Sequence, residues 1–261
     1  MVIAGGYDAF LFDLDGVLYR GADPVPHAAD ALSRLRELGK SIAFVTNNSA
    51  ATPRAVVERL RSVGVDAEAD EVETSALTTA AVLGGRGVRA AFVVGGTGLV
   101  EALTSVGLDV LDGEPAEVDV VVVGWDRSAD YDALRIASVL VQRGASLVAT
   151  NPDGSFPAAD GMRWPGAGAL LAAIETTTGV RGEVIGKPFP PLLEAALRRA
   201  GGGRPLLVGD RLDTDIAGAA RLGWHSMLVL TGISSSADAA ASQVRPTYVA
   251  PDLRSLFADV P

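Results

Sequence analysis

The chain has 261 residues, carries a formal net charge of −10 and contains no cysteine. Hydrophobic residues make up 48% and charged residues 21% of the sequence, a balance typical of globular proteins that excludes wholesale disorder. The absence of cysteine excludes disulfides, thiolate metal sites and cysteine nucleophiles. The acidic balance makes nucleic acid and anionic membranes poor partners.

No apolar run approaches the roughly 18 residues that a membrane-spanning helix requires. The N-terminus has neither the basic region nor the separate apolar region of a signal peptide. We therefore expect a cytoplasmic protein with no membrane partner.

Apolar strands alternate with helices along almost the whole chain. The expected strands span 9–12, 41–45, 89–94, 118–123, 146–149, 183–185, 205–208, 225–230 and 247–250. The expected helices span 53–63, 98–106, 131–143, 166–178, 190–200, 213–222 and 253–257, and one more helix ends near residue 38. Continuous apolar strands separated by helices predict an α/β fold with a parallel sheet covered on both faces. The glycine-rich segments 84–87 and 179–182 flank a complete strand–helix series, which indicates an inserted domain.

Two carboxylates, Asp13 and Asp15, follow the first expected strand and precede Gly16. Alternate residues of extended backbone project to the same face, so these like charges come together. That arrangement is costly unless a cation or a proton intervenes. The alternative is a purely structural role in an ordinary turn, since Asp and Gly are common turn residues.

A second acidic group lies between the strand 205–208 and the helix that follows it. Asp210, Asp213 and Asp215 supply oxygen atoms of the kind that Mg²⁺ prefers, and Arg211 stands among them. Helix capping is the alternative for carboxylates in a first helical turn. Capping does not explain Asp210, which precedes the helix.

Two further strand ends carry groups suited to an anion. Thr46, Asn47 and Asn48 offer hydroxyl, amide and backbone N–H groups ahead of a helix. Lys187, one of only two lysines in the chain, follows a short strand and precedes a proline. The alternatives are turn formation by the Thr-Asn-Asn run and a solvated surface lysine.

Taken together, these groups suit phosphoryl transfer through a carboxylate nucleophile. A phospho-receiver module and a phosphate-binding protein without turnover are the non-enzyme alternatives, although a receiver is a shorter single domain. The glycine run 95–98 fails the spacing of a dinucleotide loop because Glu101 stands where a glycine is needed. His27 and His225 lie in no motif, and we expect ordinary structural roles for both.

The order and the residues of these motifs resemble those of the haloacid dehalogenase (HAD) phosphatase superfamily, and most specifically those of its class IIA, NagD-like branch. The resemblance covers essentially the whole chain. It implies a Rossmann-like catalytic core with a parallel sheet at 1–80 and 183–261 and an inserted α/β cap domain, of the kind found in class IIA, at 81–182. It also implies a Mg²⁺ cofactor and, in this branch, a homodimer formed through the cap.

The resemblance assigns a role to each motif residue. Asp13 corresponds to the nucleophile and a metal ligand, and Asp15 to the general acid/base that also binds the metal through its carbonyl. Asp210 corresponds to the third metal ligand. The phosphate ligands are Thr46, Asn47, Asn48 and Lys187. The supporting residues are Gly16, Arg211 and Asp215.

The inserted segment also resembles this branch, at 124–128 and again at 150–153 and 165–168. The substrate contacts that it implies are Asp126, Arg127, Asn151 and Asp153, with turn chemistry as the alternative. The implied substrate is a small phosphorylated metabolite, with glycerol 3-phosphate or 2-phosphoglycolate favoured and aryl phosphates such as 4-nitrophenyl phosphate also accepted. Nucleoside monophosphates, pyridoxal phosphate and sugar phosphates stay open.

Overall fold

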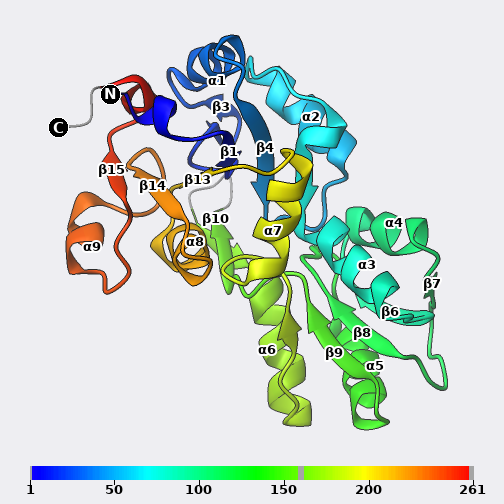
Figure 1. The fold of residues 1–261 in the computed structure, drawn as a ribbon. Helices are drawn as coiled ribbons and strands as arrows, with labels where there is room; N and C mark the ends of the chain where they lie inside the picture. The colour runs from blue at the N-terminus through cyan, green and yellow to red at the C-terminus, as the bar shows by residue number, and fades with distance from the viewer. Residues whose placement is uncertain (1, 158–161, 259–261) are drawn as a thin grey trace. The chain divides into compact units, whose positions relative to one another are not determined.

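The computed structural model describes residues 2–157 and 162–258, and the chain divides into two compact units. The first unit consists of Met1–Thr46, Arg54–Glu73 and Lys187–Pro261, and the second of Asn47–Pro53 and Thr74–Gly186. Each unit has its own parallel sheet with helices packed on it, which confirms the predicted α/β class (Figure 1).

The sheet of the first unit has six strands in the order β15-β14-β13-β1-β4-β5. Their bounds are Ala9–Phe12 (β1), Ser41–Thr46 (β4), Val72–Thr74 (β5), Pro205–Gly209 (β13), His225–Val229 (β14) and Tyr248–Ala250 (β15). The central strand β1 pairs in parallel with both β13 and β4. Strands from the two ends of the chain therefore share one sheet, as the blue and orange arrows in Figure 1 show.

Alternation along β1 sends side chains to both faces of this sheet. Ala9 and Leu11 pack in the cluster that contains Leu192 and Leu193, whereas Phe10 points to the other face. The helices of this unit are Ala28–Glu37 (α1), Pro53–Ser62 (α2), Pro190–Arg199 (α7), Ala217–Arg221 (α8) and Ser236–Ala241 (α9). The central strands are therefore buried on both sides, which explains their continuous apolar sequence.

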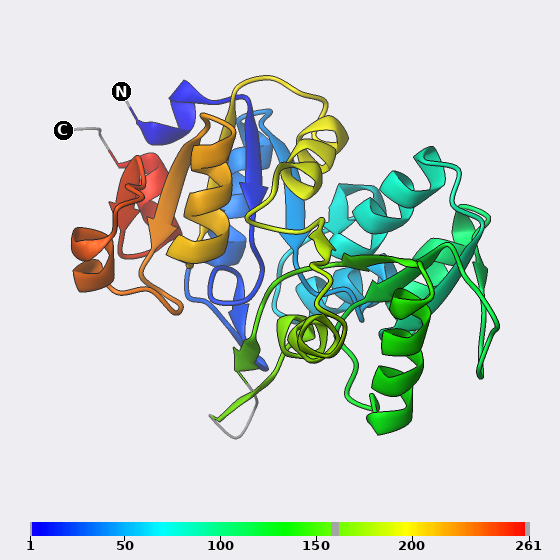
Figure 2. The ribbon, with the colours of Figure 1, turned by 90° about the horizontal axis from the view of Figure 1, so that it is seen from below.

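The sheet of the second unit has five strands in the order β12-β9-β8-β6-β7. Their bounds are Ala90–Val94 (β6), Asp109–Val110 (β7), Val120–Val123 (β8), Ser146–Ala149 (β9) and Glu183–Val184 (β12). The helices are Ser75–Gly85 (α3), Thr97–Ser105 (α4), Tyr131–Gln142 (α5) and Ala167–Thr178 (α6). On β8, Val120 and Val122 pack with α3 and α4, and the valines at 121 and 123 pack with α5 and α6 on the opposite face. Helices therefore cover both faces of this sheet (Figure 2).

Some elements differ from the sequence prediction. Helix α3 was missed because its buried residues lie on most sides of the helix, so no apolar stripe marks it. Two hairpins were also missed, Tyr19–Arg20 with Asp23–Pro24 (β2 and β3) and Ser155–Pro157 with Arg163–Pro165 (β10 and β11). The helix predicted over 213–222 is instead a wide π-helical turn at Leu212–Ile216 followed by α8. Within the described ranges, no helix is both long and apolar enough to cross a membrane.

The long segment of the second unit spans Thr74–Gly186, whereas the sequence placed the inserted domain at 81–182. Helix α3 lies in the second unit because Ala76, Ala80 and Leu83 join its core. Ile185, just after β12, is part of the same core. The glycine-rich segments therefore lie inside the second unit.

Candidate active site

Three neighbouring strands of the first sheet end at polar residues. Asp13 follows the last residue of β1, Thr46 is the last residue of β4, and Asp210 follows the last residue of β13. Because the order is β13-β1-β4, these carboxyl ends lie side by side at one edge of the sheet. Ligands of open α/β sheets bind at this edge.

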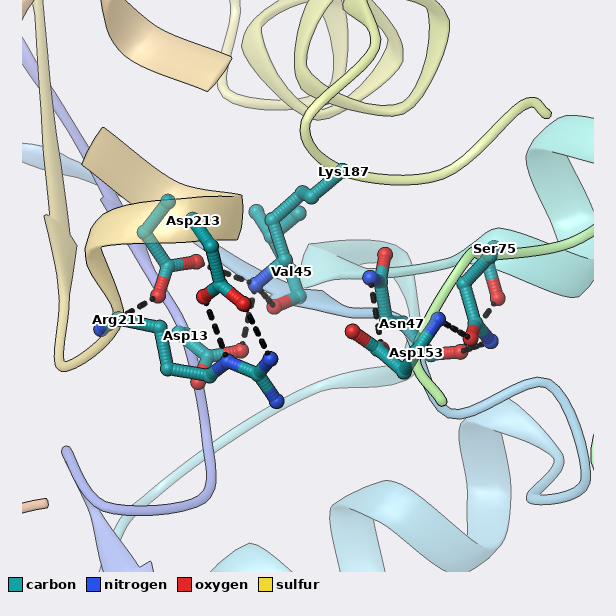
Figure 3. A network of polar contacts seen from close by, with 10 residues as sticks. Asp13, Val45, Asn47, Ser75, Asp153, Lys187, Arg211 and Asp213 are labelled. Atoms are coloured by element: carbon teal, nitrogen blue, oxygen red, sulfur yellow. Dashed lines mark hydrogen bonds and ion pairs between the residues drawn. The ribbon is translucent and has the colours of Figure 1, made fainter. Parts of the chain in front are cut away.

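Lys187 lies at the centre of a buried charged network (Figure 3). Its Nζ donates to Asp13 Oδ1 at 2.6 Å, to Asp215 Oδ1 at 2.7 Å and to the Val45 carbonyl at 3.4 Å. The lysine is 2% exposed and Asp215 is fully buried. Burial alone would lower the pKa of Lys187, but the charges of Asp13 and Asp215 outweigh it and raise that pKa. The network therefore holds one ammonium between two carboxylates.

Asp210 lies beside this network with an incomplete set of partners. Its Oδ2 accepts the Ile233 N–H at 2.7 Å, whereas its buried Oδ1 has no hydrogen-bond partner among the residues that the structure describes. Burial and the nearby charges of Asp13 and Asp215 raise the pKa of Asp210 to about 8. The carboxylate is therefore in a position that favours a cation beside it.

The acidic residues fit a divalent cation. Carboxylate oxygens of Asp13, Asp210 and Asp215 lie within 4.8 Å of one another. Oxygen ligands are those that Mg²⁺ prefers, and a cation would offset the repulsion among three buried acids. Two glycines leave room for Asp210, since a Cβ on Gly16 or Gly232 would lie 2.5 Å or 2.0 Å from its Oδ2.

Asp15 differs from Asp13 in keeping an exposed side chain. Desolvation by the surrounding protein nevertheless raises the pKa of its carboxyl, against the lowering effects of the Arg59 and Lys187 charges. Gly16 follows with a positive φ of 80°, and its carbonyl accepts the Thr231 hydroxyl at 2.6 Å. The turn therefore places a solvent-accessible acid two residues from Asp13.

Arg211 acts on the network through its backbone. Its N–H donates to Asp215 Oδ2 at 3.2 Å, while its guanidinium binds Asp213 with contacts of 3.0 Å and 2.8 Å (Figure 3). Asp213 is therefore occupied by Arg211, and Asp215 is the carboxylate that reaches Lys187.

The predicted Thr-Asn-Asn motif is divided between the two units. Thr46, which is 6% exposed, belongs to the first unit, and Asn47 belongs to the second. Asn47 Nδ2 donates to Asp153 Oδ2 at 3.0 Å (Figure 3). Asn48 is exposed, and its Oδ1 accepts the Ala50 N–H at 3.0 Å, which forms a local turn.

The four predicted contact residues of the inserted segment lie in two places. Asp126 Oδ1 accepts the N–H and the hydroxyl of Ser128, and the Arg127 guanidinium lies 4.8 Å from the centre of the Trp164 ring. Asn151 is instead 3% exposed, and its amide donates to the Asn47 carbonyl at 2.7 Å. Asp153 contacts the side chain of Asn47.

Sequence reasoning missed two contributors to these networks. Ser75 donates its hydroxyl to the Asn47 carbonyl at 2.8 Å, and no motif in its surroundings indicates that role. Gly232 lies against Asp210. Its place just after β14, at the same edge of the sheet, is a signal that could have identified it.

Comparison with known families agrees with this geometry. The model of haloacid dehalogenase-like hydrolases matches residues 10–109, and that of HAD-hydrolase-like proteins matches residues 184–256. An acid sugar phosphatase of Staphylococcus epidermidis is 38% identical over 257 residues, which cover 97% of this chain and 98% of that protein. The chain belongs to the haloacid dehalogenase-like hydrolase family.

Solved structures place the chain within that family. Glycerol phosphate phosphatase Rv1692 from Mycobacterium tuberculosis, solved in complex with magnesium, has a TM-score of 0.93 at 37% identity and matches 99% of this chain and 79% of its own. NagD from E. coli K-12 has a TM-score of 0.86 at 33% identity and matches 94% of this chain and 96% of its own. The family member described here is a phosphatase of the NagD-like branch.

Proposed function

We propose that the protein is a Mg²⁺-dependent phosphomonoesterase that acts on a small phosphorylated metabolite through an aspartyl-phosphate intermediate. The observation that carries this proposal is the cluster at the strand ends, where Lys187 contacts Asp13 and the carboxylate of Asp210 has an oxygen without a partner among the described residues. Nucleophile, counter-charge and cation ligands are the parts that phosphoryl transfer requires.

The residues at the strand ends divide the proposed reaction among them. An oxygen of Asp13 attacks phosphorus, and the bond to the ester oxygen breaks as Asp15 donates a proton to the departing alkoxide. Asp15 then takes a proton from water, which attacks phosphorus and displaces the Asp13 carboxylate as inorganic phosphate forms. Lys187 and Thr46 bind the phosphoryl oxygens. Asp13, the Asp15 carbonyl and Asp210 would hold Mg²⁺, which offsets the negative charge shared by the carboxylates and the ester.

Among substrates we favour glycerol 3-phosphate or 2-phosphoglycolate. One structural relative is named a glycerol phosphate phosphatase, which supports the first of these, while another relative is named an acid sugar phosphatase. Sugar phosphates therefore form the main alternative, ahead of nucleoside monophosphates and pyridoxal phosphate. A p-nitrophenyl phosphatase from Archaeoglobus fulgidus is also similar, which supports 4-nitrophenyl phosphate as an assay substrate.

The test is phosphate release from these esters with Mg²⁺ and with EDTA. We expect turnover that requires Mg²⁺ and that falls by about 10⁴-fold or more in Asp13→Asn, because the amide is not a nucleophile. The matched control is Asp30→Asn, an exposed aspartate of α1, which keeps full activity. Failure of the folded, Mg²⁺-loaded protein to hydrolyse any ester would contradict the proposal and favour a phosphate-binding module.

A further inference from the structure

The chain passes between the two units next to both proposed phosphate ligands. One passage lies between Thr46 and Asn47, and another between Gly186 and Lys187. Consecutive Cα atoms are about 3.8 Å apart, so the positions of Asn47 and Gly186 constrain those of Thr46 and Lys187 directly. What holds Asn47 and Gly186 therefore bears on the phosphate site.

The backbone carbonyl of Asn47 accepts two side-chain donors. Asn151 Nδ2 lies 2.7 Å and Ser75 Oγ 2.8 Å from this oxygen. Asn151 is 3% exposed and Ser75 is fully buried, so water does not compete for these bonds. Two donors occupy both lone pairs of the carbonyl and fix the direction of its peptide plane.

The side chain of Asn47 is held as well. Its Nδ2 donates to Asp153 Oδ2 at 3.0 Å (Figure 3). The N–H of Asp153 in turn donates to Asn151 Oδ1 at 3.1 Å. Asn151 therefore binds the main chain of Asn47 through its amide nitrogen and orients the partner of the Asn47 side chain through its amide oxygen.

The residue before Asn151 holds the other passage. The Gly186 N–H donates to the Thr150 carbonyl at 2.9 Å. A Cβ on Gly186 would lie 2.3 Å from that carbonyl oxygen and 2.6 Å from Asn47 Oδ1, so only glycine fits there. The dipeptide Thr150–Asn151, at the end of β9, therefore fixes Gly186 and Asn47 together.

We propose that Asn151 is a positioning residue of the phosphatase reaction, which holds the Asn47 carbonyl so that Thr46 and Lys187 keep the spacing required for one phosphoryl group. This inference rests on the proposed function, and it differs from the sequence expectation that Asn151 contacts the substrate. Asn151 acts through the chain, with Ser75 as the second donor. Misplacing a binding group by about 1 Å costs up to about 100-fold in rate.

The test uses Asn151→Leu, which keeps the approximate size of the side chain and removes its amide. We expect kcat/KM to fall about ten- to a hundredfold, by the same factor for glycerol 3-phosphate, 2-phosphoglycolate and 4-nitrophenyl phosphate. The factor is shared because the phosphoryl group is common to all three. Titration calorimetry with inorganic phosphate and Mg²⁺ then shows a matching loss of affinity, which a purely structural role would not produce.

A pair of serines provides the matched control. Ser75→Ala removes the second donor to the Asn47 carbonyl and lowers kcat/KM and phosphate affinity in the same uniform way, by a smaller factor. Ser138→Ala removes a buried hydroxyl that donates to the Leu134 carbonyl within α5, and it leaves both quantities unchanged. If Asn151→Leu does not fold, Ser75→Ala alone still tests whether hydrogen bonds to the Asn47 carbonyl position the phosphate ligands.

Three results would overturn the inference. These are unchanged kcat/KM and phosphate affinity in a folded Asn151→Leu, a loss that depends on the ester, and equal effects of the two serine variants. An ester-dependent loss would make Asn151 a substrate contact. If the wild type hydrolyses no ester, the proposed function fails, whereas phosphate binding by wild type and variants still tests the positioning role separately.

Discussion

The two units hold their polar residues in different ways. In the first unit, Lys187 is buried between Asp13 and Asp215 and forms an ion pair with each of them. In the second unit, Asn47 is held mainly by neutral donors, the amide of Asn151 and the hydroxyl of Ser75. Burying charges costs folding free energy, and burying neutral hydrogen-bonded groups costs much less.

This difference separates two requirements of a phosphoryl-transfer site. In the proposed reaction, the charged network would supply the nucleophile and its counter-charge, which neutral residues could not replace. The two donors to the Asn47 carbonyl would supply position only, and neither of them carries a charge. Substitutions in the charged network should therefore change stability and chemistry together, and those in the neutral network should change geometry.

The largest effect is expected when the central charge is removed. Lys187→Met leaves Asp13 and Asp215 buried without their shared ammonium, so the free energy of unfolding should fall by about 3–5 kcal/mol. Phosphate release should be lost as well. Urea unfolding of wild type and variant measures the first effect, and the ester assay measures the second.

The only other lysine provides the control for that experiment. Lys40 Nζ donates to the Tyr7 carbonyl at 2.7 Å and pairs with no carboxylate in the part of the chain that the structure describes. Lys40→Met should therefore cost about 1 kcal/mol and leave hydrolysis intact. Equal losses of stability in the two variants would show that the buried ion pairs do not hold the site together.

An intermediate effect is expected from filling the space beside Asn47. In Gly186→Ala, the new methyl group would meet the Thr150 carbonyl at 2.3 Å, so overpacking should cost about 1–3 kcal/mol and lower kcat/KM. Gly85 lies in the last turn of α3, where an added Cβ would have no described heavy atom within 4 Å beyond its chain neighbours and its own helix backbone. Gly85→Ala should therefore leave activity unchanged and stabilise slightly. Thermal unfolding measures the change in stability, and the ester assay measures kcat/KM. Equal changes in the two variants would contradict the prediction.

Much of the first unit could be predicted because its signals are local. Asp13 and Asp15 follow an apolar strand, and Asp210 follows another, so strand-end chemistry was visible without coordinates. The central parallel strands are continuous apolar runs, and the predicted α/β class is confirmed. The metal, phosphate and catalytic roles of these residues stay predictions.

The hydrogen bonds to Asn47 and one helix of the second unit could not be predicted because their signals are tertiary. Helix α3 has buried residues on most sides, so periodicity did not reveal it. A neutral asparagine or serine forms hydrogen bonds in many settings, and the partner of Asn151 is 104 positions away along the chain. No local pattern could tell whether Asn151 binds a ligand or the backbone of Asn47.

A change of stability with pH is expected in the metal-free protein. An aspartate carboxyl in the unfolded chain has a pKa of about 3.9, and the pKa of Asp210 in the native chain is about 8. Between these values the native chain holds the extra proton, so the free energy of unfolding falls as pH rises, by at most about 1.4 kcal/mol per pH unit. Thermal unfolding in EDTA from about pH 5 to pH 8 should show this fall, and Asp210→Asn should flatten it.

The second unit offers a control, an aspartate whose pKa is shifted in the opposite direction. Asp119 is exposed, and the N–H groups of Ala90 and Arg89 lower its pKa by donating to its Oδ2 at 3.0 Å and 2.8 Å. Its contribution to stability is therefore present above the unfolded pKa and is lost only as pH falls below it. Asp119→Asn should leave the slope across the same neutral range unchanged and reduce the loss of stability on acidification. If Asp119→Asn flattens the neutral range as Asp210→Asn does, then the slope arises from overall charge and not from the buried acid of the first unit.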